Sequence, residues 1–145
     1  MIGARRITTG RPLPATAKLA LGGEIVAAYA RARWSLRRRG LRDALDMLRS
    51  RAPGRRVAVA PDDRIAIGRR LGRTVRRTLG VLPADSRCLM CSLVLTRLLA
   101  QRGIESELVI SVRPGESFAA HAWLEHEGAA LLPPDAPASE RLVTL

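Results

Sequence analysis

The stretch from Arg87 to Gln101 is apolar on nearly every side of a helix, and no other segment restricts the fold as strongly. Its apolar positions are Leu89, Leu93, Leu95, Leu98 and Leu99. A helix that is apolar all round is stable only when other elements bury it. Asp85 or Ser86 is expected to cap its start, and Gly103 its end. The sequence therefore predicts a central helix enclosed by the rest of the chain.

Segments typical of β-strands follow this helix. We predict one strand over Ile104–Val112 and a second over Phe118–Glu125, joined by a Pro-Gly turn. Glu127-Gly128 is typical of a tight turn and leads into a third strand over 129–132, which Pro133-Pro134 ends. Because strands joined by short turns pair antiparallel, this part of the chain predicts a small antiparallel sheet.

The first half of the chain has helical periodicity and almost no strand pattern. Helices are predicted over 16–38, from 41 to about 52, and over 63–79, the last with Asp62 or Asp63 as its N-cap. The first helix would bury Leu19, Ile25, Val26, Tyr29 and Ala30 on one face. The third carries Ile67, Leu71 and Val75 at four-residue steps.

This order of elements predicts an α+β protein, with a helical N-terminal half and then a buried helix packed on a small antiparallel sheet. A chain of 145 residues is long enough for one domain with a real core. We divide it into a basic helical region, residues 1–62, and a core, residues 63–145. The two are expected to form one compact unit.

Positive charge is concentrated in the first half. Residues 1–80 hold 20 of the 25 basic residues but 5 of the 13 acidic ones. A basic surface suits nucleic acid, an anionic membrane surface or an acidic peptide. The arginines of the third helix, Arg69, Arg70, Arg73, Arg76 and Arg77, are most simply a solvated face over a buried apolar stripe.

The location of the protein is expected to be cytoplasmic. No secretion signal is visible at the start of the chain. The stretch Leu19–Ala30 is interrupted by Glu24 and is too short for a bilayer, which takes roughly 20 apolar residues. Cys88 and Cys91, three positions apart, cannot staple a small domain but fit free thiols in a reducing compartment.

Cys88 is the candidate nucleophile, because it is expected in the first turn of the central helix. Free backbone N–H groups and the positive end of the helix dipole favour a thiolate there and could stabilise an oxyanion. His121 shares a strand face with Trp123 and Glu125, and a strand packed on the helix can bring it over the helix start. Thiolate and imidazole together are the pair used by cysteine hydrolases. Cys91, deeper in the apolar body, is most simply structural.

Asp135 is the candidate for the third group, which would hold the imidazole. If Glu127-Gly128 forms a two-residue turn, position 121 pairs with 134 and position 120 with 135, so Asp135 lies within about one residue of His121. Glu125 is the second choice, because two positions along a strand are roughly 6.5 Å apart.

A zinc site is the rival interpretation of the same residues. Cys88, Cys91, His121 and His126 are the ligand types of a two-Cys, two-His site. However, 29 residues separate the pairs, against roughly 12–15 in the usual finger. His121 and His126 also point to opposite faces of a strand. We therefore expect no metal and no other cofactor.

Four runs resemble the transglutaminase-like cysteine peptidases of lasso-peptide biosynthesis. They are RCLMCSL at 87–93, LLAQRGI at 98–104, LVISV at 108–112 and FAAHAWLE at 118–125. The resemblance covers about residues 63–145 and implies a transglutaminase-like, papain-like core in which Cys88 and His121 are catalytic. The family's acidic residue stands about where this chain has Pro133. Asp135, two residues later on the same strand face, could serve in its place.

The resemblance also implies a reaction and partners. Such proteins remove the leader from a ribosomally made precursor peptide before a partner cyclase closes the macrolactam. Because residues 1–80 show helices and almost no strand pattern, we expect the stand-alone form, which relies on a separate leader-binding protein. The arginine-rich half could dock that protein, the leader, the cyclase or a membrane surface.

Two further functions stay open from the sequence. The first is a basic module that binds nucleic acid or a membrane surface without catalysis; the scarcity of aromatics and lysines speaks against nucleic acid. The second is an acyltransferase that uses the same Cys88 and His121 with an amine as acceptor.

Overall fold

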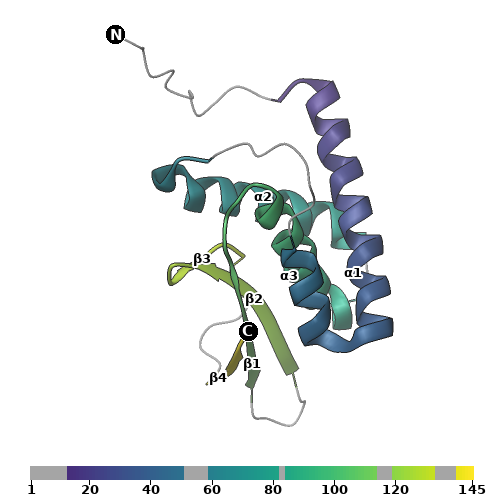
Figure 1. Ribbon diagram of the computed structural model, residues 1–145, viewed down its shortest axis with the longest axis vertical. Coiled ribbons are helices and arrows are strands. Elements are labelled where there is room, and N and C mark those ends of the chain that lie inside the picture. The colour runs from purple at the N-terminus through teal and green to yellow at the C-terminus, as the bar shows by residue number, and fades with distance from the viewer. Residues whose placement is uncertain (1–12, 51–58, 82–83, 114–118, 133–139) are drawn as a thin grey trace.

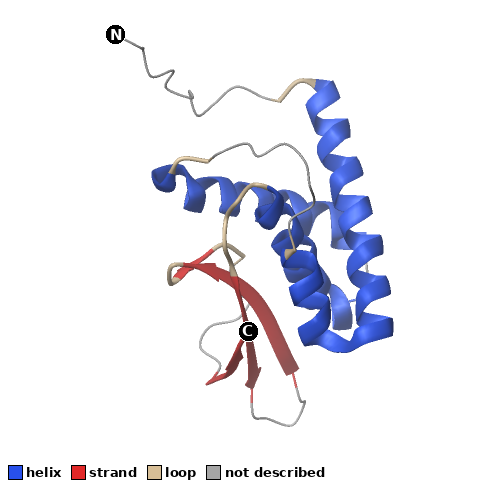
Figure 2. Cartoon of the chain, viewed as in Figure 1, coloured by secondary structure: helices blue, strands red, loops and turns tan. Residues whose placement is uncertain are grey.

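The computed structural model describes residues 13–50, 59–81, 84–113, 119–132 and 140–145 (Figure 1). Its helices are α1 (Ala15–Arg49), α2 (Arg64–Thr78) and α3 (Ala84–Gln101), with single 3₁₀ turns at η1 (Pro61–Asp63) and η2 (Leu79–Val81). Its strands are β1 (Glu107–Arg113), β2 (Ala119–His126), β3 (Ala129–Ala130) and β4 (Glu140–Thr144). Figure 2 shows the helices gathered beside the strands, so the predicted α+β class is confirmed.

The four strands form one antiparallel sheet in the order β3-β2-β1-β4. At the β2–β3 turn, Glu127 and Gly128 both have positive φ, 49° and 79°, as a two-residue type I′ hairpin requires. His126 pairs with Ala129 across it, which confirms the predicted turn and its register. The third strand is shorter than predicted, and β4 was not predicted.

The helix α3 forms the centre of the core, as its composition predicted. It packs against α1, α2 and β2 (Figure 1). Its residues Leu93, Val94, Leu95, Leu98 and Leu99 have no exposed surface. The core is therefore built around one aliphatic helix, as expected from a chain with few aromatic residues.

The element α1 consists of two helical segments separated at Gly40, whose φ of 79° and ψ of 176° are not helical. The predicted break after the arginine run is thus confirmed. The segments fold back on each other, and the Ser35 Oγ donates to the Met47 Sδ at 3.7 Å. Among the described residues, no helix is long and apolar enough to cross a membrane.

The predicted buried face of the first segment of α1 is wrong in part. Ile25 is fully buried, but Leu19 and Val26 are 77% and 63% exposed. The residues that face the core with Ile25 are Ala28, Ala32 and Ser35. Consecutive helix residues point about 100° apart, so Ile25 and Val26 cannot both face a partner as narrow as one helix. The small side chains instead let α1 approach α3 closely.

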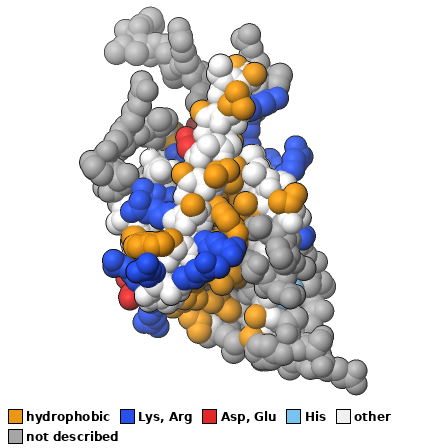
Figure 3. All heavy atoms as spheres, turned by 90° about the vertical axis from the view of Figure 1, so that its right-hand side faces the viewer, with side chains coloured by type: hydrophobic (Ala, Val, Ile, Leu, Met, Phe, Trp, Pro, Cys, Tyr) orange, Lys and Arg blue, Asp and Glu red, His pale blue; other side chains and the backbone are white. Residues whose placement is uncertain are grey.

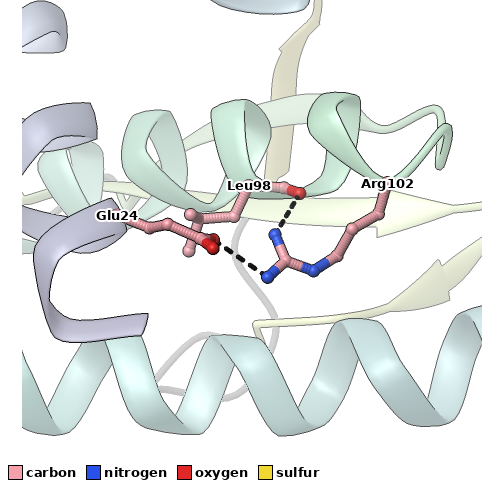
Figure 4. Close-up of polar contacts among 3 residues, drawn as sticks. All are labelled: Glu24, Leu98 and Arg102. Carbon is pink, nitrogen blue, oxygen red and sulfur yellow. Dashed lines mark hydrogen bonds and ion pairs between the residues drawn. The ribbon is translucent and has the colours of Figure 1, made fainter. Parts of the chain in front are cut away.

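Arginine side chains fasten α1 to the rest of the molecule, among them Arg49 of α1 itself, which donates to the Ser106 and Leu145 carbonyls at 2.9 and 2.8 Å. Arg97 of α3 is 6% exposed and donates to the Leu48 and Ser50 carbonyls at 3.3 and 2.7 Å, where α1 ends. Burial, and after it the positive charge of Arg31, lowers the pKa of Arg97. Directly after the last residue of α3, Arg102 donates to the Leu98 carbonyl at 3.0 Å and to the Glu24 carboxylate at 2.9 Å (Figure 4).

The helix α2 lies close against the residues that follow β3. Leu71 and Val75 are buried and Ile67 is partly buried, as their spacing predicted. A Cβ added to Gly72 would lie 2.7 Å from the Leu131 carbonyl oxygen, and one on Gly68 would lie 2.9 Å from the Leu131 side chain. Because the first contact is with backbone, position 72 requires glycine at this separation between α2 and the hairpin.

Candidate active site

Cys88 lies in the second turn of α3, because the helix begins at Ala84, three residues earlier than predicted. Asp85 and Ser86 are thus helical residues, and the prediction that one of them caps the helix is wrong. In a regular α-helix the fifth amide donates to the first carbonyl. The free N–H groups predicted at Cys88 therefore lie one turn before it.

The thiol of Cys88 nevertheless reaches β2. Its side chain is partly buried, and the Sγ lies 4.0 Å from the carbonyl oxygen of Ala120, at the long limit of a sulfur hydrogen bond. Ala120 immediately precedes His121. The fold thus brings Cys88 to a strand residue next to the candidate base, 32 positions away in the sequence.

The thiol approaches β2 from its edge. The Leu131 N–H donates to the Leu124 carbonyl at 2.8 Å, so that carbonyl points away from β1. Alternate carbonyls along a strand point the same way, which directs the Ala120 carbonyl to that side too. The described pairs between β2 and β3 are limited to Glu125 and His126. The Sγ therefore lies near the side of β2 that faces away from β1.

His121 is partly exposed and lies opposite Ser111 of β1. It shares its face with Trp123 and Glu125, as alternation predicted, whereas Ala122 and Leu124 on the other face join the core cluster with α3. The strand packs on α3 through its alanine and leucine face, and the expectation that it carries His121 over the helix start stays a prediction. Among the described contacts, no hydrogen bond joins the Cys88 thiol to the His121 ring.

Of the two candidates for the acid that orients the imidazole, the structure describes one. Glu125 is 6% exposed, and its Oε1 accepts a hydrogen bond from the Trp123 Nε1 at 2.9 Å. This carboxylate is therefore already engaged with the indole, two residues from His121. Asp135 and Pro133 lie outside the described residues.

The other thiol and imidazole lie in different surroundings. Cys91 is 2% exposed and belongs to the core cluster, as predicted. His126 is 5% exposed, and its Nδ1 lies 2.6 Å from the Glu105 carbonyl oxygen. Within the described part of the chain, no three Cys, His, Asp or Glu side chains gather closely enough to hold a metal ion.

A pocket of about 400 Å³ was not predicted from the sequence. It lies between α2 and the hairpin and is lined by Arg69, Arg73, Arg76, Ala130, Leu131 and Leu132. The Arg69 Nε donates to the Ala130 carbonyl at 3.0 Å, which fixes one of its walls. A carboxylate or phosphate would meet several guanidinium groups there. The four- and three-residue spacing of the arginines was the available signal, although it also fits the solvated face predicted for them.

A cysteine near the start of a central helix, with a histidine on the antiparallel sheet that packs against it, defines the class of papain-like α+β proteins. More particularly, the chain matches the family model described as the Transglutaminase-like superfamily over residues 26–144, and it belongs to that superfamily. The match begins within α1, well before the resembling segments. No curated protein and no solved structure is similar enough to match. Members of the superfamily are typically cysteine peptidases or transglutaminases.

Proposed function

We propose that the protein is a cysteine peptidase that uses Cys88 as nucleophile and His121 as general base and acid. The observation that carries this proposal is the position of the Cys88 Sγ, 4.0 Å from the backbone of the residue before His121. The partial exposure of both side chains supports it, because a substrate has to reach them. The buried Cys91 and His126 are the alternatives within the same elements, and neither is accessible in this way.

The proposed reaction has two steps. The Cys88 thiol transfers its proton to His121 as the sulfur attacks the scissile carbonyl. When the tetrahedral intermediate collapses, the carbon–nitrogen bond breaks and His121 returns the proton to the leaving amine. Water, deprotonated by His121, then hydrolyses the thioester and restores the thiol. Asp135 would hold the imidazole in the orientation that both steps need.

The thiol and the ring have to approach each other for this reaction. The Cys88 thiol lies near the Ala120 carbonyl, one residue from His121. Catalytic contacts are often loose without substrate and tighten when it binds. We infer that substrate binding brings the Sγ and the imidazole into hydrogen-bond distance.

The proposed substrate is a ribosomally made lasso-peptide precursor, cut between leader and core. The support is the resemblance carried by the segments around Cys88 and His121, especially FAAHAWLE at 118–125. On this proposal the protein acts in the cytoplasm with a separate leader-binding protein, ahead of a macrolactam-forming cyclase. It uses no metal or cofactor of its own.

The test is to incubate the protein with precursor and leader-binding protein and to measure product masses. Hydrolysis predicts two fragments whose masses sum to the precursor plus one water. A product that carries an added amine would instead support an acyltransferase, which the superfamily also allows. An intact precursor would contradict both, provided that the binding protein is shown to hold the leader.

A further inference from the structure

The first segment of α1 has an apolar surface that no other described element covers. Leu19, Val26 and Trp34 are 77%, 63% and 49% exposed, which is high for side chains of this size. With the exposed residues Gly23 and Ala30 they recur at three- and four-residue steps and form one stripe, here called the α1 stripe. The stripe lies opposite the face that Ile25, Ala28 and Ala32 bury against the core.

The α1 stripe runs along most of the first segment of α1. From Leu19 to Trp34 it extends about 22 Å along the helix. Figure 3 views the molecule from the side on which α1 lies and shows apolar side chains with basic ones around them. Single exposed apolar residues are ordinary on a protein surface, but a contiguous apolar patch rimmed by polar residues marks an interaction site.

The charge around the stripe is of one sign. The exposed basic residues along and beside it are Arg33, Arg37 and Arg38. The Arg38 guanidinium lies 5.8 Å from the centre of the Trp34 ring. The acidic residue of this segment, Glu24, is bound to Arg102 at 2.9 Å, and Asp43 and Asp46 come after the break at Gly40. The complementary partner is therefore apolar and anionic.

We propose that the α1 stripe binds an anionic lipid bilayer, with the helix parallel to the membrane plane. A helix in this position inserts its apolar residues at the headgroup boundary while its arginines contact anionic headgroups. Trp34 beside Arg38 fits that boundary, where indole rings are favoured. The stripe is the convex outer surface of one helix, and the described pocket lies elsewhere, over α2. A bilayer fits such a convex surface better than a partner helix does, because a partner helix packs into a groove.

The test is co-sedimentation of the full chain with vesicles of phosphatidylcholine, with and without phosphatidylglycerol. We expect binding to the anionic vesicles alone, and weaker binding at high salt. The double variant Leu19→Glu, Val26→Glu should bind at least tenfold more weakly. The control is Val81→Glu, which adds one glutamate at a position that is 90% exposed outside α1, and it should bind far more nearly as wild type does.

A second pair of variants tests the charges with little risk to folding. Arg37→Gln, Arg38→Gln should weaken binding about fivefold for each arginine removed. Arg70→Gln, Arg77→Gln removes the same charge from exposed positions of α2 and should have a clearly smaller effect. Equal effects of the two pairs would contradict a site at α1, as would wild-type binding by the glutamate variant. Absence of binding to either vesicle would also overturn the proposal, and loss of self-association in the glutamate variant would assign the stripe to a second copy of the chain.

Discussion

At the scale of residues, the two histidines of β2 have different surroundings although they are only five positions apart in the sequence. His121 is partly exposed on the face with Trp123 and Glu125, whereas His126 is buried and contacts the Glu105 carbonyl. Strand alternation predicted these opposite faces, and helical periodicity predicted that Cys91 is buried. The start of α3 was predicted three residues too late, because caps and first-turn residues draw on the same amino acids, here Asp85 and Ser86.

Replacement of each histidine should separate catalysis from structure. His121→Gln should lower kcat for precursor cleavage by about 10²- to 10⁴-fold, the usual contribution of a general base. His126→Gln should keep kcat within a few-fold and mainly lower the free energy of unfolding, because it changes a buried contact. The measurement is single-turnover cleavage together with urea unfolding. If His126→Gln were the slower enzyme, the assignment of the base would be wrong.

The orienting acid can be tested with Asp135→Asn and Glu125→Gln. We expect the Asp135 variant to lose more activity, by about 10²-fold or more, since an asparagine cannot hold the same imidazole tautomer. The Glu125 carboxylate is bound to the Trp123 indole, so its replacement should chiefly affect stability. Comparing kcat and thermal midpoints of both variants distinguishes these roles. A larger loss of kcat in Glu125→Gln would transfer the role to that residue.

At the scale of elements, prediction succeeded where the pattern is local and failed where a distant partner decides. The break at Gly40 and the turn at Glu127-Gly128 follow from the residues themselves, and both are present. The strand β4 was missed because its five residues carry a weak strand pattern. They form a strand because they pair with β1. The buried face of α1 was predicted incorrectly because close packing against α3 favours the small residues Ala28 and Ala32.

The close approach of α2 to the hairpin predicts that replacing two different glycines by alanine changes the free energy of unfolding in opposite directions. Gly72→Ala should destabilise the protein by about 1–3 kcal/mol, because the new Cβ would lie 2.7 Å from the Leu131 carbonyl oxygen. Gly22→Ala, in α1 with nothing within 4 Å of the new Cβ, should stabilise it by up to about 1 kcal/mol. Urea unfolding measures both. Equal destabilisation by the two changes would contradict the described packing.

At the scale of the whole molecule, the helical half and the sheet share one core. Ile25 of α1, Leu95 of α3 and Leu124 of β2 belong to the same buried cluster. The α+β class followed from the order of the patterns along the chain. The contribution of α1 to this core was not predicted correctly. The prediction placed larger side chains on its buried face than those that pack there.

The two tryptophans allow the unity of this molecule to be tested. Trp34 reports on α1 and Trp123 on β2. In the variants Trp34→Phe and Trp123→Phe the remaining indole follows one region by fluorescence during urea unfolding. We expect each fluorescence midpoint to coincide with that of the same variant by circular dichroism, as a single cooperative unit requires. A separate earlier transition at Trp34 would show that α1 unfolds on its own.

The most direct test of the proposed catalysis compares the two cysteines in the precursor cleavage assay. Cys88→Ala should abolish cleavage while the protein stays folded, because it removes the attacking sulfur. Cys91→Ala should cut within a few-fold of wild type despite some loss of stability, because its side chain is buried in the core. Cleavage by Cys88→Ala at the wild-type rate would contradict the account.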